Sequence, residues 1–171
     1  MDIDDGRSGS ADPSDARARI NEELNIGRVP DKAGAESSEA TEQLKWLSLG
    51  ESKELVRHWV EDLGNQRYGQ LALIAPDRGS IQATVDAEVI PPWLSREAGQ
   101  VYVLFQQYRA IGIAHCSWHY ALANIARLAL IDGNGFVAVT EELSGVITVD
   151  PEPGDEVMTF SIEAWGELIS A

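Results

Sequence analysis

An alternating stretch over residues 81–89 limits the fold of this chain more than any other feature. Apolar and polar residues take turns along it, in the order Ile81, Gln82, Ala83, Thr84, Val85, Asp86, Ala87, Glu88 and Val89. Because successive side chains of a strand point to opposite faces, the pattern predicts a strand with one buried and one solvated face. Such a strand requires a sheet that packs against a second layer. Pro91 and Pro92 end the strand.

Further strands are predicted on both sides of this one. Residues 68–75 contain a continuous apolar run, and the Pro-Asp-Arg-Gly turn at 76–79 joins that run to residues 81–89 as a β-hairpin. Three more strands are predicted towards the C-terminus, at residues 136–140, 146–149 and 157–162. Their short connections predict an antiparallel meander.

Helical signals precede the hairpin. Ser48 and Glu51 have the spacing of a capping box, and apolar residues then recur at helical spacing as far as Leu63. Gly64 suits the position after the last turn, so we expect a helix over residues 51–63. A shorter helix is expected over residues 41–47.

Two central helices are predicted between the hairpin and the meander. The first begins after Ser95 and contains apolar residues at helical spacing as far as Ile111, although the aromatic and branched run at 101–105 also favours a strand. Ser117 caps the second, which is apolar around most of its circumference and therefore buried. The predicted fold class is α+β, with an N-terminal disordered tail, a helix, a β-hairpin, two central helices and C-terminal antiparallel strands.

The N-terminal segment differs from the rest in composition. Residues 1–40 are rich in Asp, Ser, Gly, Ala and Arg and contain few large apolar residues, so they bury too little surface to offset the entropy of ordering. We predict a mostly disordered, or partner-ordered, acidic tail, with a short helix at residues 17–25 that forms against a partner. Residues 41–171 then form a single domain.

Charge is unevenly distributed along the chain. The net charge is −15, which argues against a surface for nucleic acid or for an anionic membrane. Residues 41–127 hold nine acidic and eight basic residues, whereas residues 128–171 hold nine acidic residues and no Lys, Arg or His. An acidic excess often serves only solubility, but its concentration at one end favours a basic protein partner.

Little in the sequence indicates a special compartment. A single cysteine forms no internal disulfide, and the acidic start lacks the basic and apolar regions of a signal peptide. The apolar stretch at 110–131 is interrupted by polar and charged residues, so we do not interpret it as membrane-spanning. The cytoplasm is the expected location.

An enzymatic alternative rests on His115, Cys116 and His119. If these residues share one helix, the two imidazoles face the same side, and the thiol lies near a helix N-terminus that lowers its pKa. A metal site, however, needs three or four ligands, and the only other histidine, His58, is expected on a solvent face. A buried cysteine is commonly inert.

Two other motifs fail on their context. The run from Gly133 to Ala138 fits the spacing of a dinucleotide-binding loop, but a helix precedes it and a strand follows, the reverse of what that loop requires. A calcium loop counted from Asp132 lacks Gly at position six and Glu at position twelve. No cofactor and no metal are predicted.

The strongest functional candidates are acidic. The predicted partner-binding residues are Glu141, Glu142, Asp150, Glu152, Asp155 and Glu156, together with Trp93, an aromatic anchor after two prolines. The sequence predicts a small acidic protein-binding module acting on a basic partner, an inhibitor or immunity protein being one concrete version. The alternatives are a small enzyme using the His/Cys site and a structural or assembly component. A homo-oligomer stays open.

Overall fold

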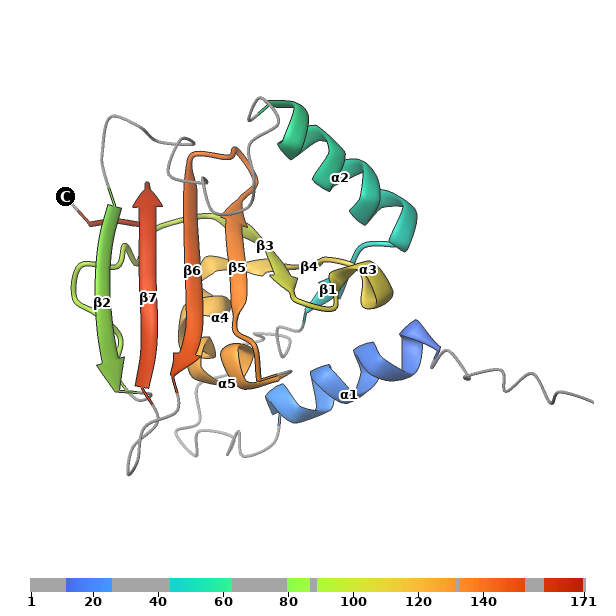
Figure 1. The fold of residues 1–171 in the computed structure, drawn as a ribbon, viewed down its shortest axis with the longest axis horizontal. Helices are drawn as coiled ribbons and strands as arrows, with labels where there is room; N and C mark the ends of the chain where they lie inside the picture. The colour runs from blue at the N-terminus through green and yellow to red at the C-terminus, as the bar shows by residue number, and fades with distance from the viewer. Residues whose placement is uncertain are drawn as a thin grey trace, which may run out of the picture.

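One antiparallel sheet organises the protein. The computed structural model describes residues 12–25, 44–62, 80–86, 89–131, 133–152 and 159–170. The described strands are β1 (Lys45–Trp46), β2 (Ser80–Asp86), β3 (Gln100–Phe105), β4 (Ala114–Ser117), β5 (Phe136–Thr140), β6 (Gly145–Glu152) and β7 (Thr159–Gly166). The described helices are α1 (Pro13–Asn25), α2 (Leu49–Asp62), α3 (Tyr108–Ile111), α4 (Trp118–Ala123) and α5 (Ile125–Leu130). The predicted α+β class is confirmed (Figure 1).

The strands follow the order β1-β4-β3-β5-β6-β7-β2, and every pair is antiparallel. The predicted meander is confirmed, because β5, β6 and β7 are consecutive neighbours. The predicted strand over residues 81–89 is present in part as β2, which ends at Asp86 and pairs with β7. Val89, which the alternation placed on the buried face, is instead exposed and lies outside the strand. Its expected hairpin partner, residues 68–75, lies outside the described residues.

The two faces of the sheet carry different layers (Figure 1). One face packs against α1, α4 and α5 and forms the larger core, around Trp118, Phe105 and Phe160. The opposite face is covered in part by α2, whose Trp59 packs with apolar residues of the central strands. The rest of this second face, on β6, β7 and β2, alternates with the core positions and is mostly polar, so it carries the candidate site.

Two predicted helix starts are confirmed in atomic detail. At the start of α2, the Ser48 amide donates to Glu51 Oε2 at 2.8 Å and the Glu51 amide donates to Ser48 Oγ at 3.2 Å, which is the expected capping box. At the start of α4, Ser117 Oγ accepts from the Tyr120 amide at 3.1 Å. The second central helix is interrupted at Asn124, which separates α4 from α5.

Two helix predictions are wrong. The helix that was expected to begin after Ser95 is instead strand β3, followed by only one helical turn in α3, so the competing strand prediction holds. In the stretch expected as a helix at 41–47, the described residues include strand β1, whose Lys45 and Trp46 pair with β4. Pairing with a neighbouring strand overrides the helical spacing in both cases.

The N-terminal prediction needs correction at α1. Residues 13–25 form a helix against the domain, longer than the predicted 17–25, and it buries Ile20 and Leu24 in the main core. Arg17 also donates to Ile111 O at 2.6 Å and to Leu47 O at 2.9 Å. Two apolar residues four apart therefore suffice, because they dock into an existing core. Residues 1–11 and 26–40 lie outside the described residues.

The sharp turn before β5 depends on glycine. Gly135 has φ +74°, and a Cβ built on it would overlap the carbonyl oxygen of Val149. Helix α5, this turn and β5 follow one another in the order that the sequence predicts, which is opposite to a dinucleotide-binding loop.

None of the helices that the structure describes is long and apolar enough to cross a membrane.

Candidate functional site: an acidic sheet face

Three cross-strand rows form the polar part of the second sheet face. The first row runs from Thr148 through Glu163 to position 82, the second from Asp150 through Ser161 to Thr84, and the third from Glu152 through Thr159 to Asp86. In every row, β6 supplies the first residue, β7 the second and β2 the third. Four acidic residues thus share one face: Asp86, Asp150, Glu152 and Glu163.

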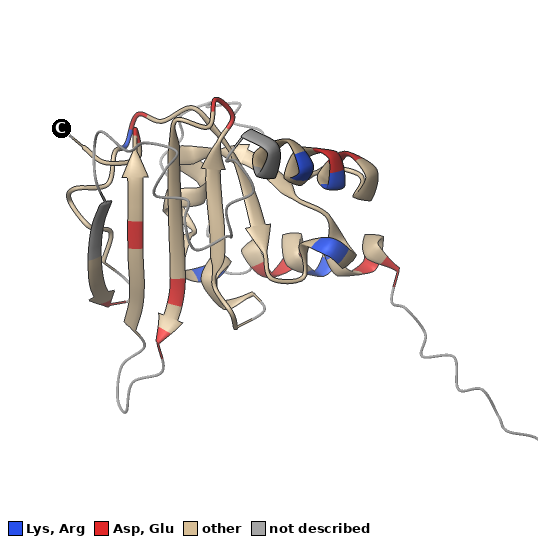
Figure 2. Cartoon of the chain, turned by 45° about the horizontal axis from the view of Figure 1, so that its top comes forward, with Lys and Arg blue, Asp and Glu red and all other residues tan. Residues whose placement is uncertain are grey.

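The described strands of this face contribute no basic residue that would offset the acidic charge. Strands β2, β6 and β7 contain no Lys, Arg or His, and Figure 2 shows red segments but no blue segment on β6 and β7. Among the described residues, ion pairs join Arg57 to Glu54 and His115 to Glu141, and neither pair involves the four acidic residues. Asp86, Asp150 and Glu152 are exposed, and Glu163 is half-buried. We call these four residues the acidic face.

The surroundings of Asp150 in the acidic face disfavour the charged form of its carboxyl group. Partial burial, followed by the nearby charge of Glu152, raises the pKa of Asp150 above its ordinary value. Both causes oppose the charged form of the carboxyl group. A cation placed beside Asp150 would favour the charged form of its carboxyl group, so the face is suited to receive positive charge.

Glu141 and Glu142 lie elsewhere, in the tight turn between β5 and β6. Both are exposed, and the turn is organised by buried Thr140, whose Oγ1 accepts from the amides of Ser144 and Gly145, each at 3.0 Å. The turn precedes β6, whereas Asp150 and Glu152 lie at its far end. From Gly145 to Asp150 the strand rises about 17 Å. The predicted carboxylates therefore form two separate groups (Figure 2).

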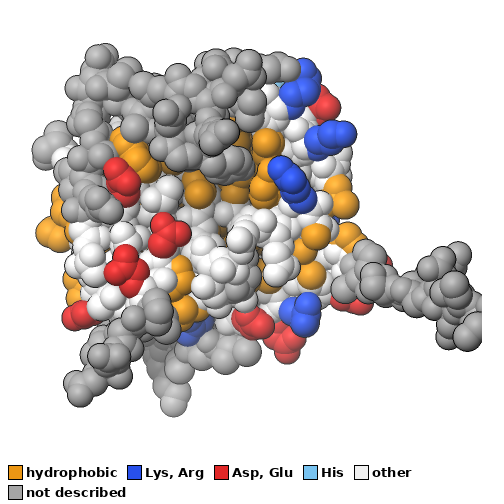
Figure 3. Space-filling model, in the orientation of Figure 1, with side chains coloured by type: hydrophobic (Ala, Val, Ile, Leu, Met, Phe, Trp, Pro, Cys, Tyr) orange, Lys and Arg blue, Asp and Glu red, His pale blue; other side chains and the backbone are white. Residues whose placement is uncertain are grey.

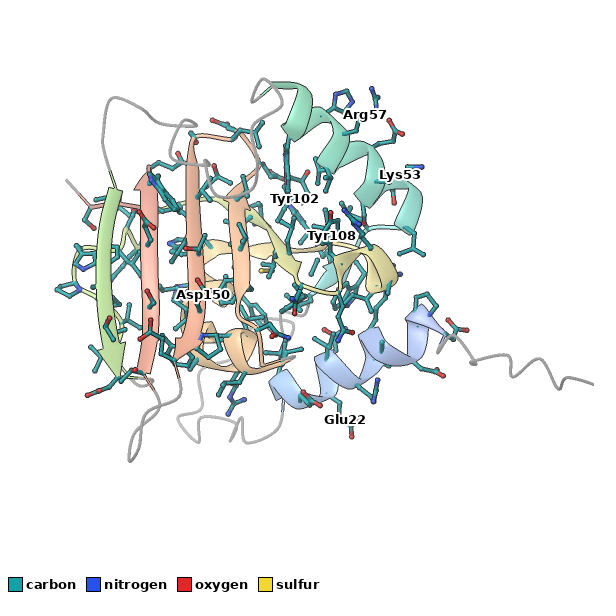
Figure 4. All side chains as sticks on the ribbon, viewed as in Figure 1. Glu22, Lys53, Arg57, Tyr102, Tyr108 and Asp150 are labelled. Carbon is teal, nitrogen blue, oxygen red and sulfur yellow. The ribbon has the colours of Figure 1, made fainter. Side chains whose placement is uncertain are left out.

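The Glu141 group includes a histidine. His115 Nε2 lies 2.7 Å from Glu141 Oε1, and the His115 ring packs on Tyr102 with ring centroids 5.0 Å apart. Tyr102 in turn packs against Trp59 of α2 in a T-shaped arrangement, with ring centroids 5.9 Å apart. Partial burial, followed by the charge of Glu141, raises the pKa of Tyr102. Figure 4 shows Tyr102 close to α2 and Asp150 away from it, on β6.

The predicted His/Cys site is not assembled. His115 and Cys116 belong to strand β4, not to the helix that carries His119. Adjacent strand residues point to opposite faces, so Cys116 is buried in the core while His115 is partly exposed on the α2 side. His119 is exposed on α4. The shared helix face on which that prediction depended is therefore wrong.

The remaining predicted residues are partly accounted for. Trp93 is half-buried and packs against the main core, on the loop between β2 and β3. Trp165, on β7, is buried. Asp155 and Glu156 lie outside the described residues. Sequence reasoning missed Asp86 and Glu163, although the alternation around each of them assigns it to the solvated side of its strand.

Two surface hollows lined by described residues lie away from the acidic face. One of about 170 Å³ separates α1 from Phe105, Ile111 and Ile131, and another of about 300 Å³ lies between Leu24 and Leu130. Within the described ranges, no group of three or more His, Cys, Asp or Glu side chains is arranged to hold a metal ion. The acidic face therefore coincides with neither of these hollows.

No protein-family model matches this chain, and no curated protein or solved structure resembles it significantly. Its function has to be inferred from the geometry and charge of the molecule itself.

Proposed function

We propose that the protein is a small acidic binding module that holds a basic protein partner against the acidic face. The observation that carries this proposal is the placement of Asp86, Asp150, Glu152 and Glu163 on one side of three adjacent strands that contain no basic residue. Such a surface steers cationic partners to itself and repels polyanions such as nucleic acid.

The spacing of the carboxylates fits a protein partner. Asp150 and Glu152 are two residues apart on one strand, which separates them by about 7 Å, and Asp86 lies two strands from Glu152, at roughly 10 Å. Lys or Arg residues one or two turns apart on a helix, or alternate residues of a strand, repeat at similar distances. A rigid sheet also loses little entropy on binding.

An inhibitor or immunity protein for a basic enzyme is one version of this function. Carboxylates on a rigid face would occupy a cationic cleft in place of the phosphates of a nucleic acid. The turn that carries Glu141 and Glu142 would supply a second contact at the opposite end of β6. The carboxylate of Glu142 would make this contact, because the carboxylate of Glu141 already contacts His115.

A direct test compares two triple variants of the full chain. The face variant is Asp150→Asn, Glu152→Gln and Glu163→Gln, and the control is Asp15→Asn, Glu22→Gln and Glu97→Gln, which changes the net charge equally at exposed sites elsewhere. The probe is a fluorescent twelve-residue peptide of alternating Lys and Gly at low salt. We expect the face variant alone to lose about tenfold in affinity, since three ion pairs with the peptide contribute roughly 0.5 kcal/mol each.

Equal losses in the two variants would contradict the proposal, because binding would then follow the net charge alone. A rise in salt should abolish the difference between the variants, as expected for exposed charges. Circular dichroism of both variants checks that the fold is retained.

A further inference from the structure

An exposed apolar segment adjoins the acidic face. Residues 89–93 read Val-Ile-Pro-Pro-Trp. Val89 is 49% exposed, the most exposed of the large apolar residues that the structure describes, and Pro92 is also exposed. Ile90 and Trp93 are half-buried, with their inner sides against the main core. We call residues 89–93 the apolar segment.

The segment is held rigidly. The Ser170 amide donates to Trp93 O at 2.7 Å, the Ser95 amide donates to Leu168 O at 2.8 Å, and Leu94 forms a β-bridge with Ile169. Two consecutive prolines fix their own φ angles. A segment restrained in this way loses little conformational entropy when a partner covers it.

Its position connects it to the acidic face. The Val89 amide donates to Asp86 O at 2.9 Å, and Asp86 is the last residue of β2. Asp86 pairs with Thr159, and Thr159 pairs with Glu152, so the backbone of Val89 lies at the sheet edge, near the end of the row that carries two of the four carboxylates. Ile90 and Trp93 then follow on the main-core side of this edge. Figure 3 shows apolar side chains at the left margin of this face, next to acidic ones.

We propose that the apolar segment and the acidic face form one docking surface, and that the partner is a cationic protein segment carrying a large apolar side chain. The proposal rests on the proposed function and adds the chemistry of the partner. Carboxylates attract the cations of the partner, and the exposed side of Val89, Ile90 and Trp93 receives its apolar side chain. Such an anchor, surrounded by charges, is where binding energy concentrates.

The test uses two peptides and the full chain. The first peptide is the twelve-residue Lys-Gly repeat, and the second has Leu in place of one central Gly. Burial of one Leu side chain predicts about tenfold tighter binding of the second peptide by the unaltered protein. We expect Val89→Ser to remove most of this gain, and Trp93→Ser to reduce it.

A matched control is available. Leu130 is 43% exposed on α5, outside the proposed surface, so Leu130→Ser removes a comparably exposed apolar side chain and should leave the gain intact. Val89 is exposed, so its substitution does not disturb the core, whereas a loss of fold in Trp93→Ser would be visible by circular dichroism.

The outcomes separate the two ideas. If the face variant binds the Lys-Gly peptide as well as the control triple variant does, the proposed function fails and the docking surface fails with it. If the face variant binds less but Val89→Ser keeps the leucine gain, only the apolar anchor is overturned. Absence of any gain in the unaltered protein also overturns the anchor.

Discussion

His115 Nε2 lies 2.7 Å from Glu141 Oε1, which joins strand β4 to the turn between β5 and β6 across the intervening strand β3. Sequence reasoning assigned these residues to two different functions, a His/Cys site and an acidic docking surface. Their contact places them in one polar cluster with Tyr102 instead. Glu141 is therefore already engaged within the molecule, and Glu142 is the carboxylate that the turn presents to a partner.

The contact between His115 and Glu141 should be weakly stabilising. Their side chains are 21% and 47% exposed, and ion pairs or hydrogen bonds at such sites are typically worth about 0.2–1 kcal/mol. A double-mutant cycle with His115→Gln and Glu141→Gln, measured by urea unfolding at pH 6, should give a coupling free energy in that range. The same cycle with Glu142→Gln should give none. A coupling of zero for His115 and Glu141 would show that the contact does not persist in solution.

Strands with one solvated face were predicted from the sequence more reliably than strands covered on both faces. β2 and the meander were recognised from alternation and turns, whereas β3 was assigned to a helix. Val103 and Phe105 of β3 belong to the main core, while Tyr102 and Leu104 pack on the α2 side. A strand covered on both faces has no alternation, so the apolar residues of β3 fit a helical spacing equally well.

The composition of the acidic face could not be predicted from local patterns. Alternation places Asp86 and Glu163 on the solvated side of their own strands. That these sides coincide depends on the pairing of β2 with β7, residues that are almost 80 positions apart in the sequence. Asp150 and Glu152 were recognised because they lie in an obvious acidic run. The site was thus predicted in part, and its remaining members required the strand order.

Arg17 should determine whether α1 stays docked. Its guanidinium donates to Ile111 O and Leu47 O and lies 5.7 Å from the centre of the Trp46 ring. Hydrogen bonds from a charged donor contribute about 1.5–3 kcal/mol, so Arg17→Ala should lower the free energy of unfolding by a similar amount. Amides of α1 should exchange faster with deuterium. Arg19→Ala, at an exposed neighbouring position, serves as the control. Unchanged exchange in Arg17→Ala would contradict the role.

Thr140 should control the turn that presents Glu141 and Glu142. Its buried hydroxyl accepts from two backbone amides, those of Ser144 and Gly145. Thr140→Val keeps the shape but leaves both amides without this acceptor, at a cost of about 1–3 kcal/mol each. We expect a loss of roughly 2–4 kcal/mol in urea unfolding. Thr140→Ser keeps the hydroxyl and should lose much less. An unchanged stability of Thr140→Val would contradict the role of the hydroxyl, and a loss in Thr140→Ser as large as in Thr140→Val would show that the methyl group matters as much.

Asp150 should make the folded state less stable at neutral pH than at acidic pH. Burial and Glu152 raise the pKa of Asp150 in the folded protein above its ordinary value of 3.8. Between the unfolded and folded pKa values the folded state therefore binds more protons, so the contribution of Asp150 to stability falls as pH rises through that window and stays low above it.

Asp150→Asn removes the ionisation, and at pH 7 it should be more stable than the unaltered protein by no more than about 1 kcal/mol after solvent screening. The difference should disappear near pH 3, where the carboxyl is protonated in both states. Glu152→Gln relieves only the second cause and should give a smaller gain. A variant Asp150→Asn that is less stable at pH 7 would show instead that the charged carboxylate is favourably solvated on this face.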